Sequence, residues 1–295
     1  MGPSVIIKNQ GNSLIKMGIQ IRYFLIEGKG LVSYIKHIKL LRKERKINYY
    51  DLYHAHYSFS GIVASLAGCK PIAVSLMGSD ARKNFLWKSI IRLFSKYSWD
   101  ITIMKSRSMK IESGLNWARI IPNGVNLDYV KPKSGVKVSK KKIVLFASDP
   151  GRPSKNFHLA RDSMLLLKDD TIEFRVIHHK PHEEIIDEIN HADLLLLTSR
   201  WEGSPNTIKE AMACNCPVVS TNVGDVRWLF GDEPGHYITS FNPEDVANKI
   251  RLALEYAKIN GSTKGRDRII TLGLDSGTIA NKIVGLYNEI AENRK

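Results

Sequence analysis

The sequence LLLLTSRWEGSPNTIKEAMAC, from Leu194 to Cys214, decides the fold of the chain. Its four leucines form a short apolar run, which is typical of a buried strand. A polar turn at Arg200–Pro205 contains a glycine and a proline, and a helical pattern begins near Asn206. In a parallel α/β sheet, ligands lie beyond the carboxyl ends of the strands, where helix N-termini present free N–H groups. The turn is therefore a candidate site for a phosphate or a sugar.

Two glutamates belong to this turn and to the helix that follows it. Glu202 lies in the turn, and Glu210 lies eight positions later in the helix. Two carboxylates so placed can accept hydrogen bonds from different hydroxyl groups of one extended ligand. Spacing alone leaves a plainer interpretation open, in which Glu202 caps the helix and Glu210 is a solvated helix residue.

Strands alternate with helices on both sides of this stretch, which predicts parallel sheets with covered faces. In the second half, strands are expected at residues 142–147, 173–177, 193–198, 217–221 and, shorter, 236–239. Helices are expected there near residues 156–167, 182–190, 206–213, 225–230, 243–258 and 276–293. The first half is expected to hold a helix at residues 5–17, a strand at 19–26, a basic helix at 31–46, and strands near 52–55, 72–76, 101–104 and 118–121.

The length of 295 residues favours two domains. A lysine-rich stretch at residues 130–142 has the character of a linker, so domains are predicted at residues 1–135 and 141–275, followed by a helix over 276–295. Hydrophobic residues make up 43% of the chain and charged residues 25%, as in globular proteins. No run approaches the roughly 18 apolar residues that span a bilayer, and the three cysteines cannot build a disulfide framework. We therefore expect a cytoplasmic protein.

Positive charge is concentrated in the first half of the chain. Residues 1–140 contain 24 lysines and arginines against 7 acidic residues, whereas the rest contains 20 against 22, within a total charge of +15. Such asymmetry predicts a polyanionic neighbour, either nucleic acid or an anionic membrane surface. Residues 82–96 mix apolar and basic side chains, which suits an interfacial helix and equally a helix packed on the sheet.

A family resemblance narrows these alternatives. Residues 202–214, the run Pro217–Thr221 and the triplet Gly224–Val226 resemble the signature of family 4 glycosyltransferases. The resemblance implies an α/β fold of the GT-B type, with two Rossmann-like domains whose parallel sheets face each other across a cleft. It also implies that the last helix packs back toward the N-terminal domain. By resemblance, Glu202 is a catalytic residue that contacts the donor sugar together with Gly203, Ser204, Pro205 and Asn206, and Glu210 binds the nucleotide ribose.

Two cations resemble the basic pair that binds the donor diphosphate in this family. Arg152 and Lys155 lie in the sequence GRPSKNF after an expected strand, and the spacing of the arginine differs from that of many relatives. Cations suit this position because the leaving nucleoside diphosphate gains negative charge as the glycosidic bond breaks. Taken without the resemblance, each is a solvated loop cation. The run Ile121–Asn126 resembles the family's signature at the end of the first domain.

The first half contributes further resemblances. Its His54-Ala55-His56 is similar to the family's His-x-His stretch, and residues 75–80 are similar to a later loop. The resemblance makes His56 a second catalytic residue and places His54 and Asp80 on the acceptor side of the site. On the residues alone, both histidines are structural or merely polar.

Two departures from the family pattern stand out. Met77 replaces a histidine that is common immediately before the glycine. The family's first strand also lacks a counterpart, because residues 1–4 resemble the end of the loop that follows that strand. A start further upstream and an impaired copy are both consistent with this departure.

The resemblance implies a retaining glycosyltransferase of hexosyltransferase type in cell-surface polysaccharide or lipopolysaccharide synthesis. Its partners would be a nucleoside diphosphate sugar and a glycan or lipid-linked acceptor, with the basic first domain on the inner face of the cytoplasmic membrane. No Asp-x-Asp motif is present, so no metal and no cofactor are expected. The histidines His178, His179, His182 and His191 are not expected to hold a metal. By resemblance, the stretch at residues 177–182 borders the nucleotide base.

Three other functions remain open at this point. A nucleotide-sugar epimerase of the same fold would need acid and base groups around the sugar and would act without an acceptor. A catalytically impaired scaffold would fit the missing strand and Met77. A nucleic-acid-binding protein would fit the basic half, although the sequence has no zinc knuckle, helix-turn-helix or aromatic RNA-binding motif. We therefore expect no nucleic-acid partner.

Overall fold

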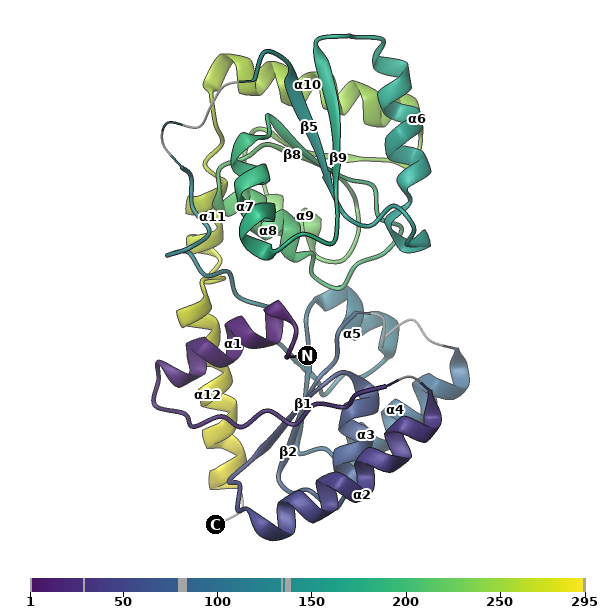
Figure 1. Ribbon diagram of the computed structural model, residues 1–295, viewed down its shortest axis with the longest axis vertical. Helices are drawn as coiled ribbons and strands as arrows, with labels where there is room; N and C mark the ends of the chain where they lie inside the picture. The colour runs from purple at the N-terminus through teal and green to yellow at the C-terminus, as the bar shows by residue number, and fades with distance from the viewer. Residues whose placement is uncertain (1, 29, 79–83, 134, 136–138, 294–295) are drawn as a thin grey trace. The chain divides into compact units, whose positions relative to one another are not determined.

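The computed structural model describes residues 2–28, 30–78, 84–133, 135 and 139–293, and it divides into two compact units (Figure 1). Unit 1 comprises Met1–Gly124 together with Ser276–Lys295, and unit 2 comprises Val125–Asp275. Each unit contains one parallel sheet, as the alternating pattern predicted.

The sheet of unit 2 has the strand order β6-β5-β7-β8-β9, and every neighbouring pair is parallel. Its strands are β5 (Lys142–Ala147), β6 (Ile172–Ile177), β7 (Leu194–Leu197), β8 (Val218–Thr221) and β9 (His236–Thr239). Its helices are η2 (Pro153–Lys155, a 3₁₀ turn), α6 (Phe157–Leu167), α7 (His182–His191), α8 (Asn206–Ala213), α9 (Val226–Phe230), α10 (Pro243–Asn260) and α11 (Gly265–Thr271). The four leucines of β7 are all buried, as their apolar run predicted.

One core of unit 2 lies where α6 and α10 pack against the sheet. Apolar residues of β5 and β7, such as Phe146 and Leu196, meet Ala160 of α6 and Ile250 of α10 there. Burial of this surface is the main favourable term in folding the unit. Asn242 caps α10 by accepting a hydrogen bond from the backbone N–H of Glu244 at 2.9 Å, which fixes where that helix begins.

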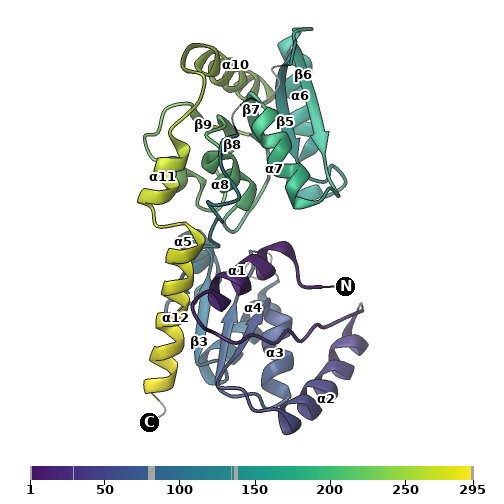
Figure 2. The same ribbon diagram turned by 60° about the vertical axis from the view of Figure 1, so that its left-hand side comes forward.

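The sheet of unit 1 has the order β1-β2-β3-β4 and is also parallel. Its strands are β1 (Tyr53–His56), β2 (Ile72–Ser75), β3 (Ile101–Met104) and β4 (Arg119–Ile120). Its helices are α1 (Val5–Ile15), α2 (Leu31–Ile47), α3 (Ser58–Leu66), α4 (Phe85–Tyr97), α5 (Arg107–Ser113) and α12 (Ser276–Glu292). The helices α1 and α12 lie side by side, as Figures 1 and 2 both show.

One expectation about unit 1 needs correction. Residues 19–26 form no strand, although their apolar character suggested one, because no neighbouring strand among the described residues pairs with them. Within the described residues, β1 therefore lies at the edge of the sheet. Gly18, with a φ of +84°, lies in the turn that follows α1, and Ile26 packs against the core of the unit.

The boundary between the units also differs from the expected one. Residues 125–135 lie with unit 2, because the backbone N–H of Val125 donates to the carbonyl of Leu274 at 2.8 Å. The guanidinium of Arg266 donates to the carbonyls of Leu127 and Val130, each at 2.7 Å. The final helix α12 belongs to unit 1. Among the described helices, none combines the length and the hydropathy that crossing a bilayer requires.

Candidate functional site

Two loops meet at the carboxyl edge of the sheet of unit 2. One follows β5 and contains η2, and the other follows β7 and contains the turn before α8. Thr198 joins them, because its hydroxyl donates to the carbonyls of Lys155 and Asn156, each at 3.1 Å. The backbone N–H of Arg200 also donates to the carbonyl of Ser154 at 2.8 Å. Bonds to the main chain hold both loops in one arrangement.

The predicted diphosphate and sugar residues contact each other across these loops. The ammonium of Lys155 lies 2.5 Å from Oε1 of Glu202, and the hydroxyl of Ser199 donates to the same oxygen at 2.8 Å. The side chains of Lys155 and Glu202 are only 14% and 18% exposed. A charge-assisted hydrogen bond at this burial is stronger than a surface ion pair. The structure thus brings together two residues that were predicted from separate motifs.

The predicted ribose residue has a partner that the sequence did not reveal. Nε2 of His182, at the start of α7, lies 2.8 Å from Oε1 of Glu210 on α8. This hydrogen bond raises the pKa of His182, against the opposing effect of burial. The ring of Tyr129 lies 5.8 Å from the ring of His182. His182 was expected beside the nucleotide base, and its observed contact is with the adjoining carboxylate.

The remaining turn residues, Gly203 to Asn206, lead directly into α8. Gly224 lies against them with a φ of +60°, and a Cβ at that position would come within 2.7 Å of the carbonyl oxygen of Gly203. Only glycine allows this close approach of two backbones. Ser204 is buried, and Pro205 occupies the N-cap position of α8.

Two buried charges support this turn, and sequence reasoning missed both. Lys209 is fully buried, and burial lowers its pKa to about 8, while the carboxylates of Asp225 and Glu210 act in the opposite direction. Burial raises the pKa of Asp225, and the charge of Lys209 opposes that shift. A lysine between the apolar positions Ile208 and Met212 was the one signal that could have revealed this arrangement.

Arg152 lies in the same loop as Lys155, but its side chain is exposed. Near it, Asp149 follows β5 and the pair His178 and His179 follows β6. Their ligand atoms all lie within 4.8 Å of one another, and Nε2 of His179 is 3.7 Å from Oδ2 of Asp149. Both histidines are exposed, and this is the one group of potential metal ligands among the described residues.

In unit 1, His54 and His56 lie on β1 with their rings stacked at 4.5 Å. Both ring nitrogens of His54 have partners, since Nδ1 lies 2.6 Å from the hydroxyl of Tyr287 and Nε2 lies 2.9 Å from the hydroxyl of Ser75. Buried Lys105 donates to the same serine at 3.4 Å. Burial, together with the charge of Lys105, lowers the pKa of His56 to about 3. His56 is therefore neutral at physiological pH.

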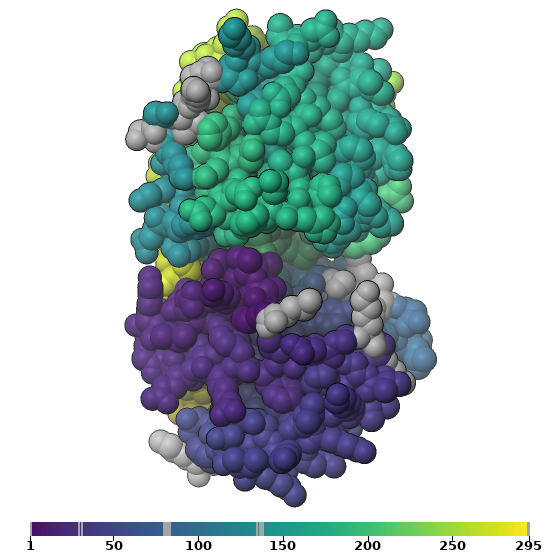
Figure 3. Space-filling view, in the orientation of Figure 1, coloured from purple at the N-terminus to yellow at the C-terminus, as the bar shows by residue number. Residues whose placement is uncertain are grey.

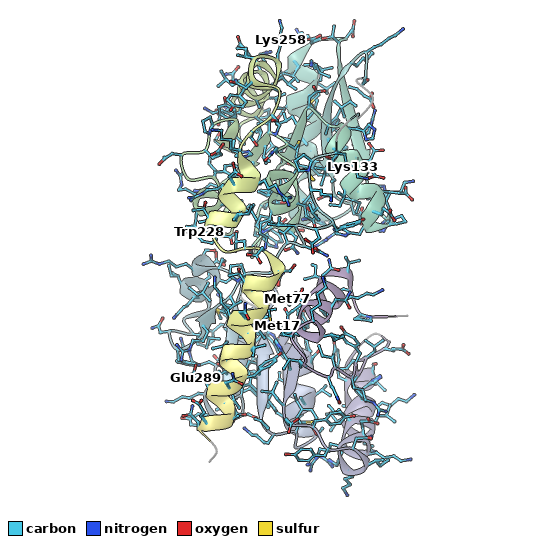
Figure 4. All side chains as sticks on the ribbon, turned by 90° about the vertical axis from the view of Figure 1, so that its left-hand side faces the viewer. Met17, Met77, Lys133, Trp228, Lys258 and Glu289 are labelled. Carbon is cyan, nitrogen blue, oxygen red and sulfur yellow. The ribbon has the colours of Figure 1, made fainter. Side chains whose placement is uncertain are left out.

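The pKa of His54 is also held well below its usual range, by burial and then by His56 and Lys105. Tyr287 belongs to α12, so the partner of His54 comes from far along the chain. Met77 lies just beyond the end of β2 in the same unit (Figure 4). Asp80, expected on the acceptor side, lies outside the described residues.

Comparison with known proteins bears on both the fold and the site. Residues 165–264 match the family model described as glycosyl transferases group 1. An uncharacterized glycosyltransferase of Methanocaldococcus jannaschii is 28% identical to this chain. The alignment covers 68% of this chain and 64% of that protein's length. The Escherichia coli UDP-Gal:alpha-D-GlcNAc-diphosphoundecaprenol alpha-1,3-galactosyltransferase is 24% identical over an alignment that covers 90% of this chain and 81% of that protein.

Solved structures share the fold over nearly the whole chain. Sucrose-phosphate synthase from Thermosynechococcus elongatus has a TM-score of 0.83 at 15% identity, covering 99% of this chain and 94% of that one. HepE from Anabaena, in complex with UDP and glucose, has a TM-score of 0.71 at 15% identity and covers 95% and 89%. The chain therefore has the GT-B fold, and its residues 165–264 match the model of the glycosyl transferases group 1 family.

Proposed function

We propose that the chain is a retaining glycosyltransferase that moves a hexose from a nucleoside diphosphate sugar to a glycan or lipid-linked acceptor in cell-surface polysaccharide synthesis. The observation that carries this proposal is the meeting of Lys155, Glu202 and Ser199 at the carboxyl edge of a parallel sheet. The E. coli relative, by its name, transfers galactose to a diphosphoundecaprenol-linked sugar, and HepE binds UDP and glucose. Both support the proposal.

The ion pair between Lys155 and Glu202 suggests how the donor enters. A diphosphate offers Lys155 a stronger counter-charge than one carboxylate, so the lysine exchanges Glu202 for the phosphate oxygens. Glu202 is then free to accept hydrogen bonds from sugar hydroxyls. Arg152, exposed in the same loop, adds a second cation as the donor binds.

The chemistry itself requires one bond to break and one to form at the anomeric carbon. The bond to the phosphate oxygen breaks, and its electron pair leaves with the nucleoside diphosphate, whose charge Lys155 stabilises. The acceptor oxygen bonds to the anomeric carbon from the same face, and its proton passes to the departing phosphate. The configuration is thereby retained. We propose no metal ion for this step, and activity that chelators abolish and magnesium restores would contradict that part.

Thermal shift measurements over a panel of nucleoside diphosphate sugars test the donor site. A bound donor should raise the melting temperature of the protein, because it stabilises only the folded state. Glu210→Ala should remove the shift, whereas Glu255→Ala, an exposed glutamate of α10, should preserve it. A normal shift in the Glu210 variant would refute its role at the ribose.

We also propose that unit 1 contacts an anionic membrane through α4. Trp87, Ile91 and Phe94 turn toward the core, so one side of the helix packs on the sheet. The other side leaves large apolar side chains in solvent, with Phe85 86% and Leu86 69% exposed. Lys88, Arg92 and Lys96 lie on the same helix. Exposed apolar groups among cations are typical of helices that lie in the membrane interface.

The helix α2 of the same unit also leaves large apolar residues in solvent. Val32 is 81% and Ile47 is 69% exposed, and the first fifty residues form much of the visible face of unit 1 (Figure 3).

Vesicle sedimentation tests the membrane contact. Vesicles that contain phosphatidylserine should bind the protein, and neutral vesicles should bind it much less. The double variant Phe85→Ser/Leu86→Ser should weaken binding, while Ile259→Ser, an equally exposed apolar residue of unit 2, should not. Equal binding to both kinds of vesicle would exclude the electrostatic contribution.

A further inference from the structure

The hydrogen bond between His182 and Glu210 joins two helices at the candidate nucleotide site. His182 is the first residue of α7, and Glu210 lies within α8. Their side chains are 19% and 17% exposed, and Nε2 is 2.8 Å from Oε1. A contact this short between two largely buried side chains fixes the orientation of both.

The two oxygens of Glu210 differ as a result. Oε1 accepts the hydrogen bond from His182, whereas Oε2 has no hydrogen-bond partner among the described residues. A carboxylate has several acceptor positions, so one anchored oxygen leaves the other available to a ligand. A glutamate without an anchor would have to be ordered when the ligand binds, at a cost in side-chain entropy.

We propose that His182 is a positioning residue for the donor nucleotide, one that holds Oε1 of Glu210 so that Oε2 faces a ribose hydroxyl. This inference rests on the proposed function, since it assumes that Glu210 binds the ribose. His182 itself touches neither the sugar nor the diphosphate. The ring centroid of Tyr129 lies 5.8 Å from that of the His182 imidazole.

Calorimetric binding of two kinds of probe tests this role. The first is whichever of UDP, ADP and GDP binds the wild-type protein most tightly, and the second is inorganic diphosphate, which has no ribose. His182→Ala should weaken nucleotide binding about tenfold, as the loss of one charge-assisted hydrogen bond implies. Binding of inorganic diphosphate, which relies on Lys155 and Arg152, should not change.

Two further variants separate positioning from mere structural support. His182→Gln should recover most of the affinity, because its amide nitrogen reaches the position of Nε2 and donates a hydrogen bond. In the double variant His182→Ala/Glu210→Ala, affinity should equal that of Glu210→Ala alone, because the histidine acts only through the glutamate. In turnover assays, His182→Ala should raise KM for the donor and leave kcat unchanged.

The outcomes distinguish this inference from the function on which it rests. Unchanged nucleotide affinity in Glu210→Ala would refute the ribose role and the inference with it. Weakened affinity in Glu210→Ala together with normal or tighter affinity in His182→Ala would overturn the inference alone. Equal losses for nucleotide and inorganic diphosphate, or additive losses in the double variant, would also overturn it. If His182→Ala does not fold, the nucleotide affinities of His182→Gln, which keeps a hydrogen-bond donor, and His182→Leu, which lacks one, are compared instead.

Discussion

The two sheets differ in the side chains that gather at their carboxyl edges. In unit 2, basic side chains pair with carboxylates, Lys155 with Glu202 between two loops and His182 with Glu210 between two helices. In unit 1, the corresponding edge holds His54 and His56, whose pKa values are depressed so that both are neutral at physiological pH. One fold thus supports an edge where two carboxylates have basic partners and an edge where two neutral histidines lie near the buried, charged Lys105. The difference lies in which side chains follow each strand, not in the architecture.

The largest expected effect concerns the buried charges beneath the edge of unit 2. Lys209→Met should lower the free energy of unfolding by about 3–5 kcal/mol, because it leaves the carboxylate of Asp225 buried without its counter-charge. Chemical denaturation measures this change, and Lys258→Met, at an exposed lysine of α10, is the matched control. The double variant Lys209→Met/Asp225→Leu should lose much less, since apolar side chains tolerate burial. A small loss in the single variant would show that Asp225 does not depend on this lysine.

Lowering the pH should reduce the stability of the fold through its neutral histidines. His56 has a folded pKa of about 3, below its unfolded value near 6.5, so its contribution to stability is complete above pH 6.5. As the pH falls from 6.5 toward 3, the unfolded chain takes up a proton that the folded chain refuses, and stability falls by up to about 1.4 kcal/mol per pH unit. His56→Gln should flatten the dependence of melting temperature on pH between 7.5 and 5.

The same experiment needs a reference in unit 2, where burial lowers the pKa of His236 to about 3. Both ring nitrogens of His236 are buried without hydrogen-bond partners among the described residues, and its ring stacks on Phe230 at 5.1 Å. His236→Phe should therefore flatten the acid response of unit 2 and raise its stability at neutral pH. An unchanged acid response in both histidine variants would mean that other groups govern acid unfolding.

The smallest effect is expected at the edge of unit 1. Tyr287→Phe removes the hydroxyl that lies 2.6 Å from Nδ1 of His54, and it should cost about 1 kcal/mol of unfolding free energy. Tyr49→Phe, at an 88% exposed tyrosine, should cost nothing measurable in the same denaturation assay. A loss well above the expected value would indicate that α12 is held to the sheet mainly through this contact.

Most strands and helices could be predicted from local periodicity. The strand at residues 142–147 and the helix at 206–213 have the expected bounds, because each combines an apolar pattern with a clear turn signal. The strand predicted at residues 19–26 was wrong, because apolar character alone does not supply a neighbouring strand to pair with. The helix α11 was missed because it is short and has too few apolar positions to establish a period.

The candidate site was likewise predictable from the sequence only in part. Its turn and its two glutamates follow from sequence, as do Lys155 and the histidines of β1. The contacts of His182 with Glu210 and of His54 with Tyr287 join residues 28 and 233 positions apart, and no local pattern encodes them. The burial of Lys209 was equally hidden, because the charge of Asp225 that acts on it comes from a different part of the sequence.

The placement of α12 has a consequence for how the protein is made. Unit 1 is assembled from two separate segments of the chain, and α12, which packs on α1, is translated only after the whole of unit 2. The contacts between α1 and α12 can therefore form only after the whole of unit 2 has been synthesised, so the first helix of the chain obtains its packing partner from the last one.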